Sequence, residues 1–283
     1  MPALSLRTVL SFIGPFTLAF GAVACGGESE TTSTSTSSST GGSGGTSTGG
    51  TGGMGTGGSG GMGTGGTAPA VEYDALVLGT LALANDLAAA KTAHDAVAGG
   101  GEAQVKALGD IGHAALLGTS LLGTQENQFL GFDRWITGNM DMVYNDPQFQ
   151  AAFGSLFSAP PTLEKYQRQP TWLGWGDLDS GKAFPTYYYA VIRGTLKDTK
   201  TAQATHDMVA GAGKTTVEAA GDVAHVAFTG RDDQTKALFI DVWKDSAAIT
   251  AVYENPQFQQ GFSALFEGAP TIGIYKSTDW HQW

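Results

Sequence analysis

Apolar and polar residues alternate in short blocks along the last hundred residues of the chain. Four blocks, 187–196 (YYYAVIRGTL), 225–229, 236–243 (KALFIDVW) and 271–276, are rich in aromatic and β-branched residues and predict strands. Residues 197–220 and 246–253 have helical spacing, and Asn255 before Pro256 predicts a fresh helix that runs through Phe266. The predicted order is therefore βαββαβ.

An earlier part of the chain repeats this order. Strands are predicted at 75–81, 113–117, 129–135 and 162–166, with one helix through Leu108 and another starting at Asp146 and Pro147. Residues 94–118 and 206–230 align without a gap and share 13 of 25 positions, which indicates a tandem duplication. Such units usually form a four-stranded antiparallel sheet with both helices on one face. We expect an α+β protein of two ferredoxin-like repeats, 71–180 and 181–283, packed sheet to sheet in one monomeric chain.

The N-terminal residues have a different composition. Residues 1–24 contain one basic residue, Arg7, and an apolar run too short for a membrane span, which predicts an export signal peptide. The following AVACGG resembles a bacterial lipobox, which implies cleavage before Cys25 and acylation of that cysteine. The alternative is a plain secretory signal with an incidental cysteine. Residues 25–70 are mostly Gly, Ser and Thr and predict a disordered tether. The expected location is the cell envelope, lipid-anchored at the outer membrane or cell surface.

Charge and motifs exclude several classes of function. The formal net charge is −11 with only 15 Lys and Arg residues, so no basic stripe is available for nucleic acid. Cys25 is the only cysteine, which leaves no internal disulfide or cysteine metal cluster. The motifs HExxH, CxxC and GxSxG do not occur. A His-Asp doublet occurs twice in equivalent places, unlike the scattered ligands of a metal-dependent phosphohydrolase, so we predict no metal site.

Four of the five histidines fall in the duplicated stretch. His94 and His206 lie on helical stripes that should face the sheet; the first stripe also includes Leu83 and Leu87. Each histidine is either a pocket imidazole that transfers a proton or a buried structural residue. The next residues, Asp95 and Asp207, should point to the boundary or to solvent. The later pairs are predicted to end the first helix of each repeat rather than to bind a substrate, namely Asp110 with His113 and Asp222 with His225.

Asp133 and Asp241 interrupt apolar strands and share a strand face with Trp135 and Trp243. Because a carboxylate in a half-buried strand needs a partner, we predict the pairs His206–Asp241 and His94–Asp133 beside a pocket lined by these tryptophans. The alternative places each aspartate at an exposed sheet margin. The remaining aromatic candidates are two tyrosines that supply a phenol at the pocket mouth or pack a helix junction, Tyr144 and Tyr253, and four tail tryptophans that wall a pocket or seal the sheets, Trp172, Trp175, Trp280 and Trp283.

These motifs together support a family resemblance. The histidine and aspartate of each first helix, IDVW in a strand (FDRW in the first repeat), NPQFQ opening the last helix (DPQFQ in the first repeat) and the WxxW tails resemble the dimeric α/β-barrel superfamily, and within it the antibiotic biosynthesis monooxygenase-like domains. The resemblance covers both repeats. It implies a cofactor-independent monooxygenase, although the superfamily also includes haem-degrading enzymes, isomerases and proteins without known activity. No residue specifically indicates haem, and we predict no cofactor.

Two functions follow as alternatives. The first is a membrane-tethered monooxygenase in which His206, Asp241 and Trp243 orient a small hydrophobic or aromatic, quinol-type substrate and assist its deprotonation. The second is a non-catalytic ligand-binding or structural surface module. The repeats differ in that Leu78, Gly131 and Arg134 stand where the second has Arg193, Phe239 and Val242. If one repeat is catalytic, we expect it to be the second. A substrate-sized cavity beside His206 or His94 would favour the enzyme, and a filled core would favour the structural module.

Overall fold

The computed structural model describes residues 71–178 and 187–283. The first half contains β1 (Tyr73–Thr80), α1 (Leu87–Ala107), β2 (Asp110–Gly118), the short 3₁₀ helix η3 (Leu121–Gly123), β3 (Gln128–Trp135), α2 (Met140–Tyr144), α3 (Pro147–Gly154) and β4 (Thr162–Arg168). The second half contains β5 (Tyr188–Thr195), α5 (Ala202–Ala220), β6 (Asp222–Gly230), β7 (Lys236–Trp243), α6 (Ser246–Tyr253), α7 (Pro256–Leu265) and β8 (Thr271–Ser277). The expected βαββαβ order is therefore present in each half, with the second helical segment broken in two.

The eight strands form one closed barrel in the order β1-β3-β2-β8-β5-β7-β6-β4. All neighbouring strands are antiparallel. Within each half the strands follow the ferredoxin-like order, β4-β1-β3-β2 and β8-β5-β7-β6. The halves join where β2 pairs with β8 and β4 pairs with β6. The predicted closure of a barrel by two sheets of one chain is confirmed.

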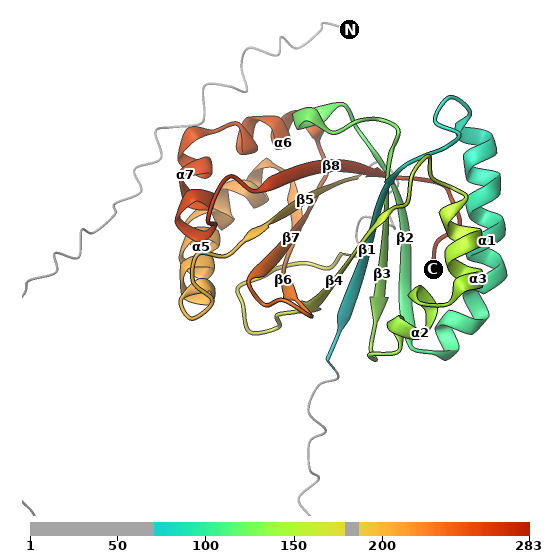
Figure 1. Ribbon diagram of the computed structural model, residues 1–283. Coiled ribbons are helices and arrows are strands. Elements are labelled where there is room, and N and C mark those ends of the chain that lie inside the picture. The colour runs from blue at the N-terminus through green and yellow to red at the C-terminus, as the bar shows by residue number, and fades with distance from the viewer. Residues whose placement is uncertain (1–70, 179–186) are drawn as a thin grey trace, which may run out of the picture. The chain divides into compact units, whose positions relative to one another are not determined.

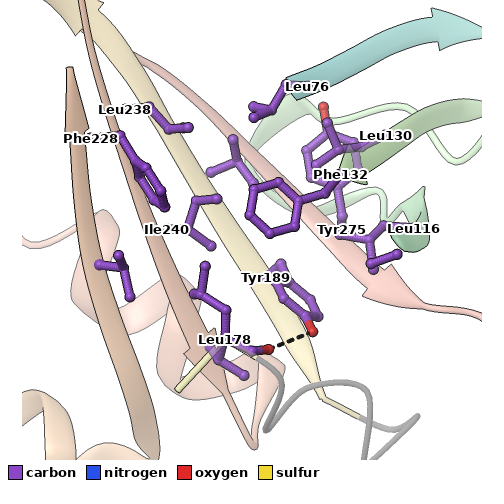
Figure 2. Close-up of a cluster of buried hydrophobic side chains, with 14 of the residues drawn as sticks. Leu76, Leu116, Leu130, Phe132, Leu178, Tyr189, Phe228, Leu238, Ile240 and Tyr275 are labelled. Atoms are coloured by element: carbon purple, nitrogen blue, oxygen red, sulfur yellow. Dashed lines mark hydrogen bonds between the residues drawn. The ribbon is translucent and has the colours of Figure 1, made fainter. Parts of the chain in front are cut away.

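The two faces of each sheet pack against different partners. Side chains such as Leu76, Phe132, Tyr189 and Ile240 fill the barrel interior, and the hydroxyl of Tyr189 donates to the carbonyl of Leu178 at 3.0 Å (Figure 2). The opposite faces are covered by helices, α1 to α3 on the first half and α5 to α7 on the second (Figure 1). Alternating side chains of each strand therefore contribute to two separate cores.

The boundaries correct three predictions. Helix α5 begins at Ala202 rather than at residue 197, because the Asp198 carboxylate accepts from the backbone of Lys200 and folds the chain into a turn. Leu83 precedes α1 and is 46% exposed, and Leu87 is 44% exposed, so neither belongs to the buried stripe. The stripe is buried further along, where α1 lies against the sheet.

The tail of each half lies against the other half. Backbone hydrogen bonds join Trp175, after β4, to His225 on β6, in both directions at 3.1 and 2.9 Å. Likewise Trp283, after β8, is joined to His113 on β2 at 3.0 and 3.2 Å. The C-terminus consequently lies beside α1 and α3 of the first half (Figure 1).

Candidate functional site

A pair of buried histidines lies between helix and sheet in the second half. His206 projects from α5, and His225 lies on β6. Gly221, with φ of +111°, ends α5 in the left-handed conformation and turns the chain directly into β6. The Nε2 atoms of His206 and His225 are 2.9 Å apart, and the two rings stack with centroids 5.1 Å apart. Because both residues are less than a tenth exposed, this contact is made away from solvent.

Carboxylates extend this pair into a chain of hydrogen bonds. Asp241 on β7 lies directly opposite His225 in the strand register, and its Oδ1 contacts His225 Nδ1. The hydroxyl of Tyr253, the last residue of α6, donates to the other oxygen of Asp241. At the far end, His206 Nδ1 lies 2.9 Å from Asp207 Oδ1. Five side chains are thus connected from the helix surface to the buried end of α6.

The first half contains the same chain. His94 Nδ1 lies 3.0 Å from Asp95, and His94 Nε2 lies 3.2 Å from His113 Nε2. The Nδ1 of His113 contacts Asp133, which accepts from the Tyr144 hydroxyl through its other oxygen. The arrangement is therefore built twice, around strands in the same register.

The tail of each half covers the hydrogen-bonded chain of the other half. Trp175 stacks on His225 at 4.7 Å and Trp172 lies 5.0 Å from His206. The C-terminal tail does the same for the first half, where Trp283 lies 4.6 Å from His113 and Trp280 lies 5.1 Å from His94. Tail backbone N–H groups also bind the outer carboxylates, Leu173 to Asp207 and His281 to Asp95, both at 2.7 Å. Each site therefore includes residues from both halves.

Burial sets the protonation of the outer members. Desolvation lowers the pKa of His94 and of His206 to about 4, so both imidazoles are neutral at pH 7. For Asp95, burial alone would raise the pKa, but hydrogen bonds from the His281 backbone, Lys91 and His94 lower it to about 2. The pKa of Asp207 is lowered in the same way, with the Leu173 backbone as donor. The outer carboxylates are therefore ionised and accept from the histidines.

A count of protons then assigns the hydrogen bonds. Because ionised Asp207 cannot donate, His206 donates from Nδ1, and its Nε2 must accept from His225 Nε2–H. His225 Nδ1 and Asp241 must then share one further proton, since Tyr253 already donates its own to Asp241. Two neutral imidazoles, one phenol and two ionised carboxylates would supply three of these protons. The four hydrogen bonds of the chain need four, so the chain holds one additional proton. The same count applies to His94, His113 and Asp133.

A cavity of about 60 Å³ adjoins the hydrogen-bonded chain of the second half. Its lining includes His206, His225 and Asp241 together with apolar residues of α5 and α7. Asp222 also reaches it; burial, and then the nearby Asp241 charge, raise the pKa of Asp222 to about 9. A cavity of about 150 Å³ is needed to hold a benzene ring. The space therefore holds a few water molecules or a diatomic gas, but not an aromatic ring, unless a wall residue moves.

The predicted direct pairs are wrong, although their residues belong to one network. His225 stands between His206 and Asp241, and His113 stands between His94 and Asp133. The margin alternative is also wrong, because both aspartates are buried. Asp222 does not end a helix with His225 as predicted. It is the first residue of β6, where its carboxylate accepts from Ala224 N–H at a β-bulge, and Asp110 accepts likewise from Gly112.

The aromatic predictions have mixed outcomes. Trp243 borders the cavity and Trp135 is buried in the equivalent core. Tyr144 and Tyr253 do not lie at a pocket mouth; both are buried with their hydroxyls on the strand aspartates. The tail tryptophans do seal, but across the halves. A sequence signal for the positions of His113 and His225 does exist. Alternate residues of a strand share a face, and pairing the second strand of each half with the third strand places each histidine opposite its aspartate.

The site does not fit a haem. Both ring nitrogens of each of the four histidines already face a hydrogen-bonding partner, and the cavity is far smaller than a porphyrin. Within residues 71–178 and 187–283, no group of three or more His, Cys, Asp or Glu side chains has an arrangement that could hold a metal ion. In the same residues, no helix is long and apolar enough to cross a membrane.

Comparisons with known proteins address the fold. No protein-family model matches the sequence, and neither does any curated protein. Among solved structures, an anthrone oxidase-like protein superimposes with a TM-score of 0.53 and 14% identity, over 76% of this chain and 93% of its own. The protein has the dimeric α/β-barrel fold. A monooxygenase-like protein from Listeria innocua is also similar (TM-score 0.43, 11% identity, 75% and 96% coverage), as is a chlorite dismutase variant from Candidatus Nitrospira defluvii (0.45, 13%, 74% and 92%).

Proposed function

We propose that this barrel is a cofactor-independent monooxygenase whose second half oxidises a small phenolic or quinol-type substrate. The observation that carries the proposal is the buried proton chain from Asp207 to Tyr253, which borders a mostly apolar cavity. Proton transfer in a water-poor space is the contribution a protein can make when the substrate itself reduces dioxygen. The similarity to an anthrone oxidase-like protein supports the fold on which this proposal rests.

The proton count defines the role of the chain. His206 donates to Asp207 and accepts from His225, so it has no lone pair free for a substrate. The exchangeable proton is the one shared by His225 and Asp241. The chain therefore first gives a proton to reduced oxygen and then regains one from the substrate. For a phenolic substrate with an activated CH₂ group, such as an anthrone, the balanced reaction converts that CH₂ group and O₂ into a carbonyl and water, so no external reductant is required.

The substrate ring needs more space than the cavity provides. Trp175 is the wall residue that stacks on His225, and it belongs to the tail of the first half rather than to the sheet. In the proposed complex its indole withdraws and the substrate ring takes its place on the imidazole. Substitution of Trp175 by alanine should therefore enlarge the site without removing any member of the proton chain.

Oxygen consumption with a panel of quinols and anthrones tests the proposal. The wild type should consume oxygen with at least one substrate, and His225→Gln, which removes one holder of the shared proton, should lower that rate about a hundredfold. The matched variant His113→Gln, in the first half, should retain the rate. If the wild type and Trp175→Ala both consume oxygen no faster than the uncatalysed reaction, the enzyme proposal is wrong.

A non-catalytic module is the second candidate, and one observation favours it. Indoles already occupy the space beside the histidine pair in both halves, as they would in a purely structural network. Under this alternative, substitutions in either hydrogen-bonded chain change the free energy of unfolding, and no variant or wild-type protein consumes oxygen faster than the uncatalysed reaction. The oxygen assay separates the two candidates.

We also propose that the barrel is a lipoprotein domain and that its halves descend from one duplicated unit. The lipobox-like AVACGG and the Gly, Ser and Thr composition of residues 25–70 support a lipid-anchored tether at the cell envelope; both lie outside the described residues. The shared 13 of 25 positions supports duplication. Metabolic labelling with a palmitate analogue should mark the wild type and not Cys25→Ser; equal labelling would remove the proposed anchor.

A further inference from the structure

One charged pair enters the barrel interior at the end where β1 finishes. Arg193 on β5 donates from Nη1 to Glu164 Oε1 on β4 at 2.6 Å, and the Tyr166 hydroxyl donates to Glu164 Oε2 at 2.7 Å. The two side chains come from different halves and are only 21% and 28% exposed. An ion pair at this depth contributes little net stability, because desolvation offsets the attraction. Its placement calls for another explanation.

The pair breaks the likeness of the two halves. Leu78 is the counterpart of Arg193 on β1, and Gly273 is the counterpart of Glu164 on β8. A side chain at Gly273 would meet the Tyr275 ring, since a Cβ there would lie 2.6 Å from it. The equivalent position of the second half therefore has no room for a glutamate, and Leu78 and Gly273 stand where a counterpart of the Arg193–Glu164 pair would lie.

A cavity of about 320 Å³ opens beside this pair. Its volume lies within the range of small-molecule pockets, about 300 to 1,000 Å³. Hydroxyl and amide side chains and a short apolar surface complete its wall; the lining includes Thr80, Gln128, Ser158, Thr162, Leu78 and Pro160. The pocket thus offers both charges, neutral hydrogen-bonding groups and an apolar patch.

Both charged groups have unused hydrogen-bonding capacity. In the part of the chain that the structure describes, the bond to Glu164 is the one hydrogen bond of the Arg193 guanidinium, which has five N–H donors. The Glu164 carboxylate accepts one bond at each oxygen and can accept more. A ligand carboxylate can therefore bind Arg193 while a ligand ammonium binds Glu164. Because the protein charges are adjacent, the ligand charges must be adjacent too.

We propose that this mouth of the barrel, between Arg193 and Glu164, is a binding site for a free α-amino acid. The α-carboxylate lies on the guanidinium, the α-ammonium lies on the Glu164 carboxylate, and the side chain lies toward Leu78 and Pro160. A ligand with a single charge can bind only Arg193 or only Glu164, so it makes one of the two charged contacts that an amino acid makes. The site is separate from the histidine chains and does not depend on the proposed oxygenase activity.

Calorimetric titration of the full chain tests this site with three L-amino acids, alanine, leucine and phenylalanine, against propionate and ethylamine. At least one amino acid should bind with one-to-one stoichiometry, and the singly charged compounds about tenfold more weakly or less. Arg193→Leu, which copies the first half, and Glu164→Gln should each weaken amino-acid binding about tenfold. Lys200→Gln, which removes one exposed positive charge elsewhere, should not.

A second measurement avoids reliance on the variants. The Nε–H resonance of Arg193 in wild-type protein should shift during the same titration and saturate with the calorimetric curve. The proposal is overturned by the absence of both heat and resonance shift at millimolar amino acid. Propionate binding as tightly as alanine would also overturn it, because the mouth would then be a simple anion site, and so would unchanged binding by folded Arg193→Leu.

Discussion

The two halves build one hydrogen-bonded chain with different aromatic neighbours. In the second half Phe239 on β7 stacks on His206 at 4.8 Å, whereas the first half has Gly131 at that position and Phe129, two residues earlier, lies 5.5 Å from His94. The second half has Ala237 where the first has Phe129. One ring is thus supplied from either of two positions on the third strand, while the polar residues stay fixed.

This difference indicates which part of the site is constrained. A phenyl ring needs only volume and can be supplied from either position, because dispersion contacts are not directional. The chain of imidazoles and carboxylates needs a proton in every link, and the loss of any member leaves a buried group unsatisfied. The polar chain should therefore behave alike in the two halves, and the packing around it should not.

The largest effect is expected at the strand aspartates. Asp241→Ala and Asp133→Ala each remove the partner of a buried histidine and of a buried tyrosine hydroxyl. Each should lower the free energy of unfolding by about 3 to 5 kcal/mol. Urea denaturation measures the two values, which should agree within about 1 kcal/mol, the scale of context effects on a buried polar group. A loss confined to one half would contradict the equivalence of the chains.

The tails should differ more. Trp280 is 6% exposed and contacts both His94 and Phe129, whereas Trp172 is only half-buried against His206. Trp280→Ala should cost about 3 kcal/mol and Trp172→Ala about half as much, in proportion to the apolar area each removes from water. Thermal and urea unfolding of both variants give the order. Equal losses would mean that tail packing, like the polar chain, is the same in both halves.

Protonation offers a test of the histidines themselves. The pKa of His94 falls from 6.5 to about 4 on folding, so the unfolded chain binds the proton first. The stabilising contribution is complete above pH 6.5 and is lost as the pH falls toward 4. The stability difference between wild type and His94→Gln should therefore shrink by about 3 kcal/mol between pH 7 and pH 4.

The pair His206→Gln and wild type should give the same pH dependence, because burial lowers the pKa of His206 equally, to about 4. The raised pKa of Asp222 has the opposite sign, since that group favours folding at low pH, but it is present in both proteins and cancels in the difference. A difference that stays constant with pH would show that folding does not shift the pKa of these imidazoles.

Periodicity predicted the barrel better than it predicted the site. The strand and helix patterns, repeated twice, were enough to place His94 and His206 on the buried face and to close two sheets on one another. The direct link from His206 to Asp241 failed because a helix residue and a strand residue can be joined only once the register of β6 on β7 is known. That register depends on the β-bulge after Asp222, which shifts the pairing by one residue.

The exchange of the tails could not have been predicted from either repeat alone. Trp172 and Trp175 follow the first sheet in sequence, and local pattern assigns them to it. They reach the second half because β4 pairs with β6, which carries the chain across the junction between the sheets. Only the closed topology determines which histidine each indole covers.

The smallest effect concerns two glycines in equivalent helices. Gly213 in α5 borders the cavity and Gly101 is its counterpart in α1; a Cβ added at either would meet no other atom within 4 Å. Since alanine is favoured over glycine inside a helix, Gly101→Ala and Gly213→Ala should each raise the free energy of unfolding by about 0.5 to 1 kcal/mol. If Gly213→Ala stabilises the fold as Gly101→Ala does but lowers oxygenase activity, the helix wall contacts the substrate. If both variants gain stability and the rate is unchanged, the substrate lies instead on the Trp175 side of the cavity.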